Sequence, residues 1–245
     1  MGTLYLVRHG QASFGADDYD VLSPLGHRQS VRLGEYFKTK GLRFDAALTG
    51  TLNRQRQTFA GICEGLGVAF ASTPATNLPP DSMLATRAVP DALPHRLWPG
   101  LNEYDSAAVI AAIHPQPLAK PDTPELYRHH FRLLKDGLAQ WMAGAVSPRG
   151  MPSYIEFVAG MTGALEHVRT QHQGNVLLVS SGGPIATAVG HVLGTRAETT
   201  IELNMSIRNC SVTEFSFTPK RHRLLTFNTL PHLDAPEYAD WVTSA

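Results

Sequence analysis

The sequence predicts an α/β fold, a three-layer α/β/α sandwich around a mostly parallel central sheet. Short apolar runs at residues 4–7 and 176–179 are typical of buried strands, and residues 44–48 are predicted to form a second strand along the chain. Each run precedes a stretch with helical apolar spacing, and this alternation of strand and helix is typical of parallel α/β sheets. A chain of 245 residues is also long enough to bury a sizeable core.

Capping and turn signals delimit the expected elements in chain order. Ser23 followed by Pro24 is typical of a helix N-terminus. The run 176–179 is the strongest strand signal, and we expect it at the centre of the sheet. The pattern predicts helices at 23–40, 52–64, 124–143, 153–171 and 185–193, a third strand at 67–72, a proline-rich irregular segment at 73–100, and a hairpin of strands 209–218 and 223–228.

The first predicted strand ends in the tripeptide Arg8-His9-Gly10. Glycine is typical of a strand end, so Arg8 and His9 are expected at the carboxyl edge of the sheet, where open α/β sheets bind ligands. An oriented imidazole can act as a nucleophile, and a guanidinium presents a planar fork of donors to phosphate oxygens. The pair therefore indicates phosphoryl transfer through a phosphohistidine, whereas the tripeptide alone also fits a capped strand with a surface arginine.

Several stretches together resemble the histidine phosphatase superfamily, in its phosphoglycerate-mutase-like branch. The hallmark of that family is an Arg-His-Gly at the end of the first strand. Further matches are residues 22–26 to the family's Leu-Ser/Thr-x-x-Gly, residues 50–58 to its Ser-x-Leu-x-Arg-Ala-x-x-Thr, residues 101–103 to its Leu-x-Glu, and residues 230–233 to its carboxyl end. The resemblance implies a single domain over residues 1–245, with a helical cap inserted at about 102–172.

The resemblance also implies roles for individual residues. His9 is expected to be the phosphorylated nucleophile, and Arg8 and Arg54 are expected to bind phosphate, although Arg54 taken alone also fits a solvated helix residue. Glu103 is the candidate general acid for the leaving oxygen. Asp105, two residues later, is the competing candidate for the general acid. An acidic residue at this place could instead cap a helix over residues 106–113. No metal or cofactor is expected, because the two arginines neutralise the phosphoryl charge.

The sequence departs from the family at the end of strand 176–179, where Ser181 stands in place of the second catalytic histidine of a Ser-His-Gly-Gly motif. A serine hydroxyl can still donate one hydrogen bond, and backbone amides from Gly182 onward can cradle phosphate, so both residues are predicted to bind it. Losing one preorganised donor typically costs about 10²–10³ in rate. A catalytically weakened module that binds a phosphorylated ligand or a protein therefore stays an alternative to an enzyme.

The loop after Gly10 favours a phosphatase over a phosphoglycerate mutase. Mutases of the family usually carry Trp-Asn a few residues later and further basic residues for a substrate carboxylate, whereas residues 12–16 contain no asparagine. The predicted activity is therefore hydrolysis of a small-molecule phosphate monoester, with a mutase as the other enzymatic alternative. The sequence leaves the physiological substrate open.

Composition excludes several other classes of protein. The net charge is formally zero, so no nucleic-acid-binding face is expected, and the eleven histidines show no metal-ligand spacing. Residues 175–195 lack charges but are interrupted by Gly182, Gly183 and Pro184, so no membrane span is expected. Two cysteines without paired spacing and the lack of a signal-peptide pattern predict reduced thiols and a cytoplasmic location. A homodimer stays open.

Overall fold

A computed structural model describes residues 1–12, 20–73, 92–118 and 122–244. These residues form a seven-stranded sheet in the order β3-β4-β2-β5-β1-β6-β7. The strands are β1 (Gly2–Arg8), β2 (Ala46–Thr49), β3 (Phe70–Thr73), β4 (Leu93–Leu97), β5 (Gly174–Ser180), β6 (Val212–Thr218) and β7 (Arg221–Thr229). The pairs among β1 to β5 are parallel, and β6 and β7 are antiparallel to their neighbours. The predicted mostly parallel α/β sheet is confirmed, with β5 at its centre.

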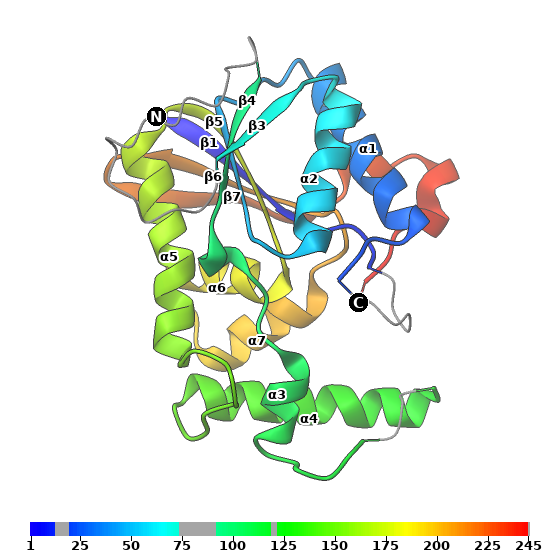
Figure 1. The fold of residues 1–245 in the computed structure, drawn as a ribbon, viewed down its shortest axis with the longest axis vertical. Helices are drawn as coiled ribbons and strands as arrows, with labels where there is room; N and C mark the ends of the chain where they lie inside the picture. Colours follow the sequence, from blue (N-terminus) through cyan, green and yellow to red (C-terminus); the bar gives the residue numbers. More distant parts are fainter. Residues whose placement is uncertain (13–19, 74–91, 119–121, 245) are drawn as a thin grey trace.

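Helices cover both faces of this sheet (Figure 1). Val176 and Leu178 of β5 belong to a core shared with α5 (Tyr154–Gln171) and α6 (Gly182–Leu193). Leu177 and Val179 belong to the opposite core, with α1 (Pro24–Thr39) and α2 (Asn53–Leu66). Successive side chains of a strand point to opposite faces, so an unbroken apolar run is what a strand covered on both sides requires.

The start of α1 is held against the chain that leaves β1. Ser23 caps the helix as predicted, because its hydroxyl oxygen accepts a hydrogen bond from the Gly26 amide at 3.0 Å. A Cβ atom on Gly26 would lie 2.1 Å from the Gln11 carbonyl oxygen, and one on Gly10 would lie 2.5 Å from the Gly26 oxygen. Both positions therefore need glycine, and their close contact fixes the segment that follows His9.

The structure corrects three expectations. Strand β4 lies inside the segment predicted to be irregular. The sequence pattern missed this strand because Pro94 and Arg96 obscure its alternating burial and because it pairs with β2 and β3, which are distant in sequence. Helix α6 begins at Gly182 rather than 185, with Ser181 at its N-cap. Helix α7 (Ala197–Ser206) was not predicted at all. Residues 74–91 of the predicted irregular segment lie outside the described residues.

The region predicted as a cap contains three helices that pack differently. Helices α3 (Ser106–Ala111) and α4 (Pro124–Met142) lie beyond the end of the sheet, beside α7 (Figure 1). Their apolar side chains form a separate core that includes Val109, Leu134 and Trp141. Helix α5 instead packs on the sheet through residues such as Met161. The part of the predicted cap that stands away from the sheet is therefore α3 and α4.

Candidate active site

A pocket of about 550 Å³ opens at the carboxyl ends of the central strands. All of the predicted site residues except Ser181 line it. The lining residues are Arg8, His9, Leu52, Arg54, Glu103, Tyr104, Asp105, Ser106, Tyr127, His130, Phe131, Leu134, Gly182, Asn204 and Met205. Residues from β1, α2, α4, α6 and α7 thus meet in one cavity, as expected where parallel strands end at a common edge.

His9 is held as a neutral imidazole whose Nε2 faces Arg54. Its Nδ1 lies 2.8 Å from the Gly10 carbonyl oxygen, and since that oxygen can only accept, Nδ1 carries the proton. Nε2 then accepts a hydrogen bond from Arg54 Nε at 3.3 Å. Burial, followed by the charges of Arg8 and Arg54, holds the pKa of His9 well below its usual value. At neutral pH the ring therefore presents an Nε2 lone pair, which is the form that a nucleophile requires.

The backbone around His9 is braced by the carboxyl-terminal segment. Asn209 Nδ2 donates to the His9 carbonyl oxygen at 3.3 Å, and Asn209 Oδ1 accepts from Thr243 Oγ1 at 3.0 Å. Gln29 Nε2 donates to Thr243 Oγ1 at 3.0 Å, and Gln29 Oε1 accepts from the Gln11 amide at 2.9 Å. Both ends of the segment 9–11 are thus tied, through buried amides, to residues near the carboxyl terminus.

Arg54 is fixed at the start of α2 rather than exposed to solvent. Its side chain is 9% exposed, and Nη1 forms an ion pair with Asp20 Oδ1 at 2.8 Å. The other oxygen of Asp20 accepts from the Asn53 amide at 2.8 Å, so this carboxylate also caps α2. The solvated alternative for Arg54 is therefore wrong. Sequence analysis did not identify Asp20, because the polar loop around it carries no signal for a partner more than thirty positions later.

The Glu103 carboxylate lies at the first turn of α6. Its Oε1 and Oε2 accept from the Gly183 amide at 3.2 and 3.1 Å, and Oε1 also accepts from the Tyr104 amide at 3.2 Å. Burial raises the pKa of Glu103, against the opposing effects of the Gly183 amide and of Arg54 and Arg8. A Cβ on Gly183 would lie 2.3 Å from Oε1, so glycine is required for this contact.

Asp105, the competitor of Glu103, caps α3. Its Oδ1 accepts from the amides of Ala107 at 2.9 Å and Ala108 at 3.0 Å. Although Asp105 lines the pocket, its carboxylate is engaged by the helix N-terminus. The capping alternative therefore describes Asp105, whereas the Glu103 carboxylate accepts from the Gly183 amide of α6.

Ser181 is fully buried and does not line the pocket, although its neighbour Gly182 does. Its Oγ accepts a hydrogen bond from Gln55 Nε2 at 2.9 Å, and the same Nε2 donates to the Leu101 carbonyl oxygen at 2.8 Å. Ser180 Oγ donates to that same oxygen at 2.7 Å. Gln55 was missed by sequence analysis, since a polar residue after Arg54 gives no sign that it points inward and reaches α6.

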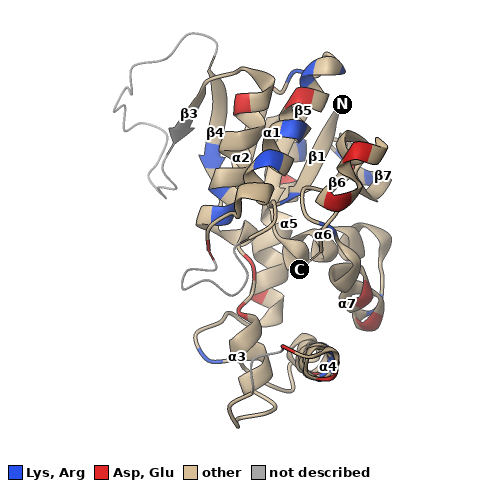
Figure 2. Ribbon diagram, turned by 90° about the vertical axis from the view of Figure 1, so that its right-hand side faces the viewer, with Lys and Arg blue, Asp and Glu red and all other residues tan. Residues whose placement is uncertain are grey.

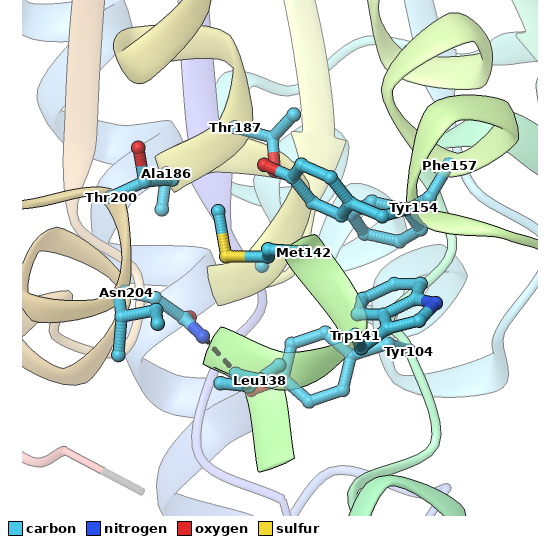
Figure 3. A pocket seen from close by; sticks show the side chains of 12 residues that line it. Tyr104, Leu138, Trp141, Met142, Tyr154, Phe157, Ala186, Thr187, Thr200 and Asn204 are labelled. Carbon is cyan, nitrogen blue, oxygen red and sulfur yellow. Dashed lines mark hydrogen bonds between the residues drawn. The ribbon is translucent and has the colours of Figure 1, made fainter. Parts of the chain in front are cut away.

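A second cavity lies behind the wall of this pocket (Figure 3). The two are separated by Tyr104 and Asn204, whose Nδ2 donates to the Tyr104 hydroxyl at 2.8 Å, drawn as a dashed line. Aromatic and aliphatic side chains such as Trp141, Phe157 and Leu138 surround a volume of only about 20 Å³. That space is too small for a phosphate ester, so the larger pocket is the candidate site.

The described residues were also expected to lack a metal site, a membrane-spanning helix and a strongly charged face. Within the described part of the chain, no group of three or more His, Cys, Asp or Glu side chains is arranged to hold a metal ion. No described helix is long and apolar enough to cross a membrane. Figure 2 shows basic and acidic residues interspersed over α1, α2 and the β6–β7 end of the sheet. Cys63 and Cys210 are buried free thiols, as predicted.

The fold and this site define the class of protein. A model of the histidine phosphatase superfamily (branch 1) matches residues 4–76 and 87–230. The chain therefore belongs to the histidine phosphatase superfamily, which confirms the family expected from the sequence motifs.

Curated relatives include both mutases and a phosphatase. A 2,3-bisphosphoglycerate-dependent phosphoglycerate mutase of Chelativorans sp. is 38% identical over 78 residues, which cover 29% of this chain and 38% of that protein. A broad-specificity phosphatase of Saccharomyces cerevisiae is 34% identical over 64 residues, covering 23% of this chain and 27% of that protein. The chain thus matches well under half of the length of these relatives.

Solved structures resemble nearly the whole chain. YhfR of Bacillus stearothermophilus has a TM-score of 0.62 and 16% identity, covering 95% of this chain and 99% of that chain. Phosphoserine phosphatase of Entamoeba histolytica in complex with phosphoserine has a TM-score of 0.57 and 17% identity, covering 95% and 100%. Phosphoglycerate mutase of Bacillus anthracis has a TM-score of 0.61 and 15% identity, covering 94% of each chain. At these identities the likeness shows the shared fold.

Proposed function

We propose that the protein is a phosphatase that hydrolyses small-molecule phosphate monoesters through a phosphohistidine on His9, without a metal or cofactor. The observation that supports this most strongly is the state of His9. Its Nδ1 is tied to the Gly10 carbonyl oxygen, and Nε2 lies beside Arg54 in a pocket large enough for an ester. A neutral, oriented imidazole next to guanidinium groups is suited to attack on phosphorus and is more than ligand binding requires.

In the first step, His9 Nε2 attacks phosphorus in line with the ester oxygen. The N–P bond forms, the P–O bond breaks, and the leaving oxygen takes the proton of the Glu103 carboxylic acid. Arg8 and Arg54 donate hydrogen bonds to the phosphoryl oxygens, whose charge they offset. The raised pKa of Glu103 supports its role as acid, because more of the carboxyl group stays protonated near neutral pH.

In the second step, water attacks the phosphohistidine. The Glu103 carboxylate takes the proton of that water, the N–P bond breaks, and inorganic phosphate leaves while His9 returns to its neutral form. The Gly182 amide lies in the wall of the pocket at the start of α6, where the helix dipole favours an anion. We propose that this helix start binds a phosphoryl oxygen during both steps.

We also propose that Ser181 occupies the position of the family's second catalytic histidine and that Gln55 fills the space that an imidazole would take. The fully buried contact between Gln55 Nε2 and Ser181 Oγ at 2.9 Å supports this. The Ser181 hydroxyl accepts from Gln55 beneath the pocket, so we assign it a supporting role and assign phosphate contact to Gly182. The site then lacks one imidazolium, and slow turnover is expected.

The test is hydrolysis of a generic phosphate monoester in the presence of EDTA, combined with trapping of acid-labile phosphoprotein. Wild type is expected to turn over and to become labelled, and His9→Ala is expected to lose both, with a rate loss on the order of 10⁴ or more. His191→Ala is the matched control, because His191 is an exposed histidine near the end of α6. It should retain both activity and label.

Two alternatives predict different results in the same assay. A binding module that has lost catalysis would bind phosphate esters without turnover or label, and this outcome would refute the phosphatase. A phosphoglycerate mutase would be labelled from 2,3-bisphosphoglycerate and would interconvert 2- and 3-phosphoglycerate faster than it released inorganic phosphate. Phosphate release as the main product, with the label on His9, is the result expected here.

A further inference from the structure

We infer that the pocket selects phosphate monoesters whose leaving group is aromatic or otherwise apolar and carries no second negative charge. The inference rests on the proposed phosphatase function, since it concerns the part of the same pocket that would hold the leaving group. It follows from the side chains that line the pocket away from His9.

The side of the pocket formed by α4 is mostly apolar. Helix α4 contributes Tyr127, Phe131 and Leu134, one face of the helix at spacings of four and three residues, together with His130. Leu52, at the start of α2, and Met205, near the end of α7, also line the pocket. Side chains from three separate helices therefore converge to offer an apolar surface to whatever is attached to the phosphate.

Two aromatic rings of this wall are partly exposed to solvent. Tyr127 is 41% exposed, and its ring centroid lies 4.5 Å from that of Phe131, which is only partly buried. An aromatic pair placed at a cavity mouth gains most when a further apolar or aromatic group covers it. An apolar leaving group would supply that cover, whereas a small hydrophilic one would leave the pair in water.

The charges of the pocket are segregated toward one end. Among the described lining residues, the arginines are Arg8 and Arg54, and both lie beside His9. The pocket lining also holds the acidic Asp105, and burial and neighbouring His129 lower the pKa of His130, which disfavours its cationic form. A carboxylate or a second phosphate on the leaving group would therefore meet the apolar side chains of α4 and the acidic Asp105 rather than an arginine.

The available volume also suits a ring-sized group. A cavity of about 150 Å³ holds benzene, and this pocket measures about 550 Å³. The site therefore has room for the phosphoryl group together with a ring-bearing alcohol. By contrast, phosphoserine, the ligand in one structure with the same fold, carries both a carboxylate and an ammonium group beside its phosphate.

The experiment compares kcat/KM for 2-phenylethyl phosphate, phosphoserine, 3-phosphoglycerate and glycerol 2-phosphate. All four release an alkyl alcohol, so differences in leaving-group reactivity, which would favour aryl phosphates in any phosphatase, are small. Wild type should prefer 2-phenylethyl phosphate to the two carboxylate-bearing esters by about tenfold or more, the usual scale for discrimination by an apolar pocket.

Substitutions on α4 test whether the side chains of this helix cause the preference. Phe131→Ala should lower kcat/KM for 2-phenylethyl phosphate about tenfold, mainly through KM, and should change the glycerol 2-phosphate value little. Tyr127→Lys should raise kcat/KM for 3-phosphoglycerate, because it adds a cation at the apolar end. The control is Ile155→Ala, which removes an apolar side chain that is 81% exposed on α5 and lies outside the pocket.

The inference is overturned if phosphoserine or 3-phosphoglycerate equals or exceeds 2-phenylethyl phosphate, or if Phe131→Ala lowers all four values equally. In either case phosphohistidine on His9 would still form, and the proposed phosphatase would stand without this selectivity. Absence of both label and turnover with every ester would instead refute the phosphatase itself, and the inference with it.

Discussion

The two ends of the pocket are built in contrasting ways. At the phosphate end, Arg8, His9 and Arg54 are buried, and the His9 ring is hydrogen-bonded at both nitrogens. At the apolar end, Tyr127 and Phe131 are more exposed and present apolar faces. Chemistry requires fixed polar groups, and selection of a leaving group requires apolar contact area. The contrast agrees with the proposal that the sheet edge carries catalysis and that α4 carries selectivity.

After the loss expected for His9→Ala, the largest expected effect comes from removing the proposed acid at the phosphate end. Glu103→Gln should lower kcat for 2-phenylethyl phosphate by about 10²–10⁴, the usual contribution of a general acid or base. Phosphorylation of His9 by p-nitrophenyl phosphate should be less affected, because nitrophenolate leaves without a proton. Rapid-quench measurement of the nitrophenolate burst separates the two steps. Equal loss of the burst and of steady-state turnover would contradict a role as acid.

A gain of activity should come from reversing the proposed replacement of the family's second histidine by Ser181. Ser181→His alone places an imidazole against the Gln55 amide in fully buried space, and such overpacking costs about 1–3 kcal/mol of stability. Combining it with Gln55→Ala removes the conflict, and Leu101 O keeps its bond from Ser180 Oγ. The double variant should raise kcat by about 10²-fold, the scale of one preorganised donor.

Steady-state kinetics and thermal unfolding are measured for Ser181→His, for Gln55→Ala and for the double variant. If Gln55→Ala with Ser181→His folds as stably as wild type and shows no gain in kcat, the proposed equivalence of Ser181 with the second histidine is wrong. Gln55→Ala alone serves as the control, since it opens the space without adding an imidazole.

The pH profile should have an acid limb and an alkaline limb, each with a slope of about tenfold in rate per pH unit. Both limbs should come from groups at the phosphate end and none from the apolar end. His9 must be neutral, so activity should persist as pH falls below 6.5 and decline only near its lowered pKa. Glu103 must be protonated, so activity on alkyl esters should decline as pH rises through its raised pKa. Glu103→Gln should abolish the alkaline limb, and Phe131→Ala should leave both limbs in place. An alkaline limb that survived Glu103→Gln would assign it to another group.

The smallest expected effect concerns the brace behind His9. Thr243→Ala removes the hydroxyl that links Gln29 to Asn209, and a hydrogen bond of this kind contributes about 0.5–1.5 kcal/mol. We expect a fall in kcat of about threefold to tenfold with little change in KM. Thr243→Ser keeps the hydroxyl and should restore kcat. Equal loss in both variants would point to packing of the methyl group rather than to positioning of His9.

The sequence by itself determined the residues whose place follows from a local pattern. An apolar strand followed by Arg8-His9-Gly10 predicts side chains at the carboxyl edge, and a helix that begins near Arg54 predicts an arginine at the same edge. The structure brings both to one pocket with Glu103. The fold class, the central strand and the family could be predicted from the sequence because alternating strand and helix patterns and short motifs depend on residues near one another in the chain.

Tertiary structure decided the partners of those residues. Three partners are distant in sequence from the residues they support, and no local period marks them: Asp20 pairs with Arg54, Gln55 donates to Ser181, and Thr243 is linked to His9 through Asn209. The amphipathic pattern of α4 would fit any helix that buries one face, so the pattern alone does not predict a pocket wall. The wall depends on the place where α4 packs, beyond the end of the sheet. Local sequence fixes where a side chain leaves its own strand or helix, and only the packed chain fixes what that side chain meets.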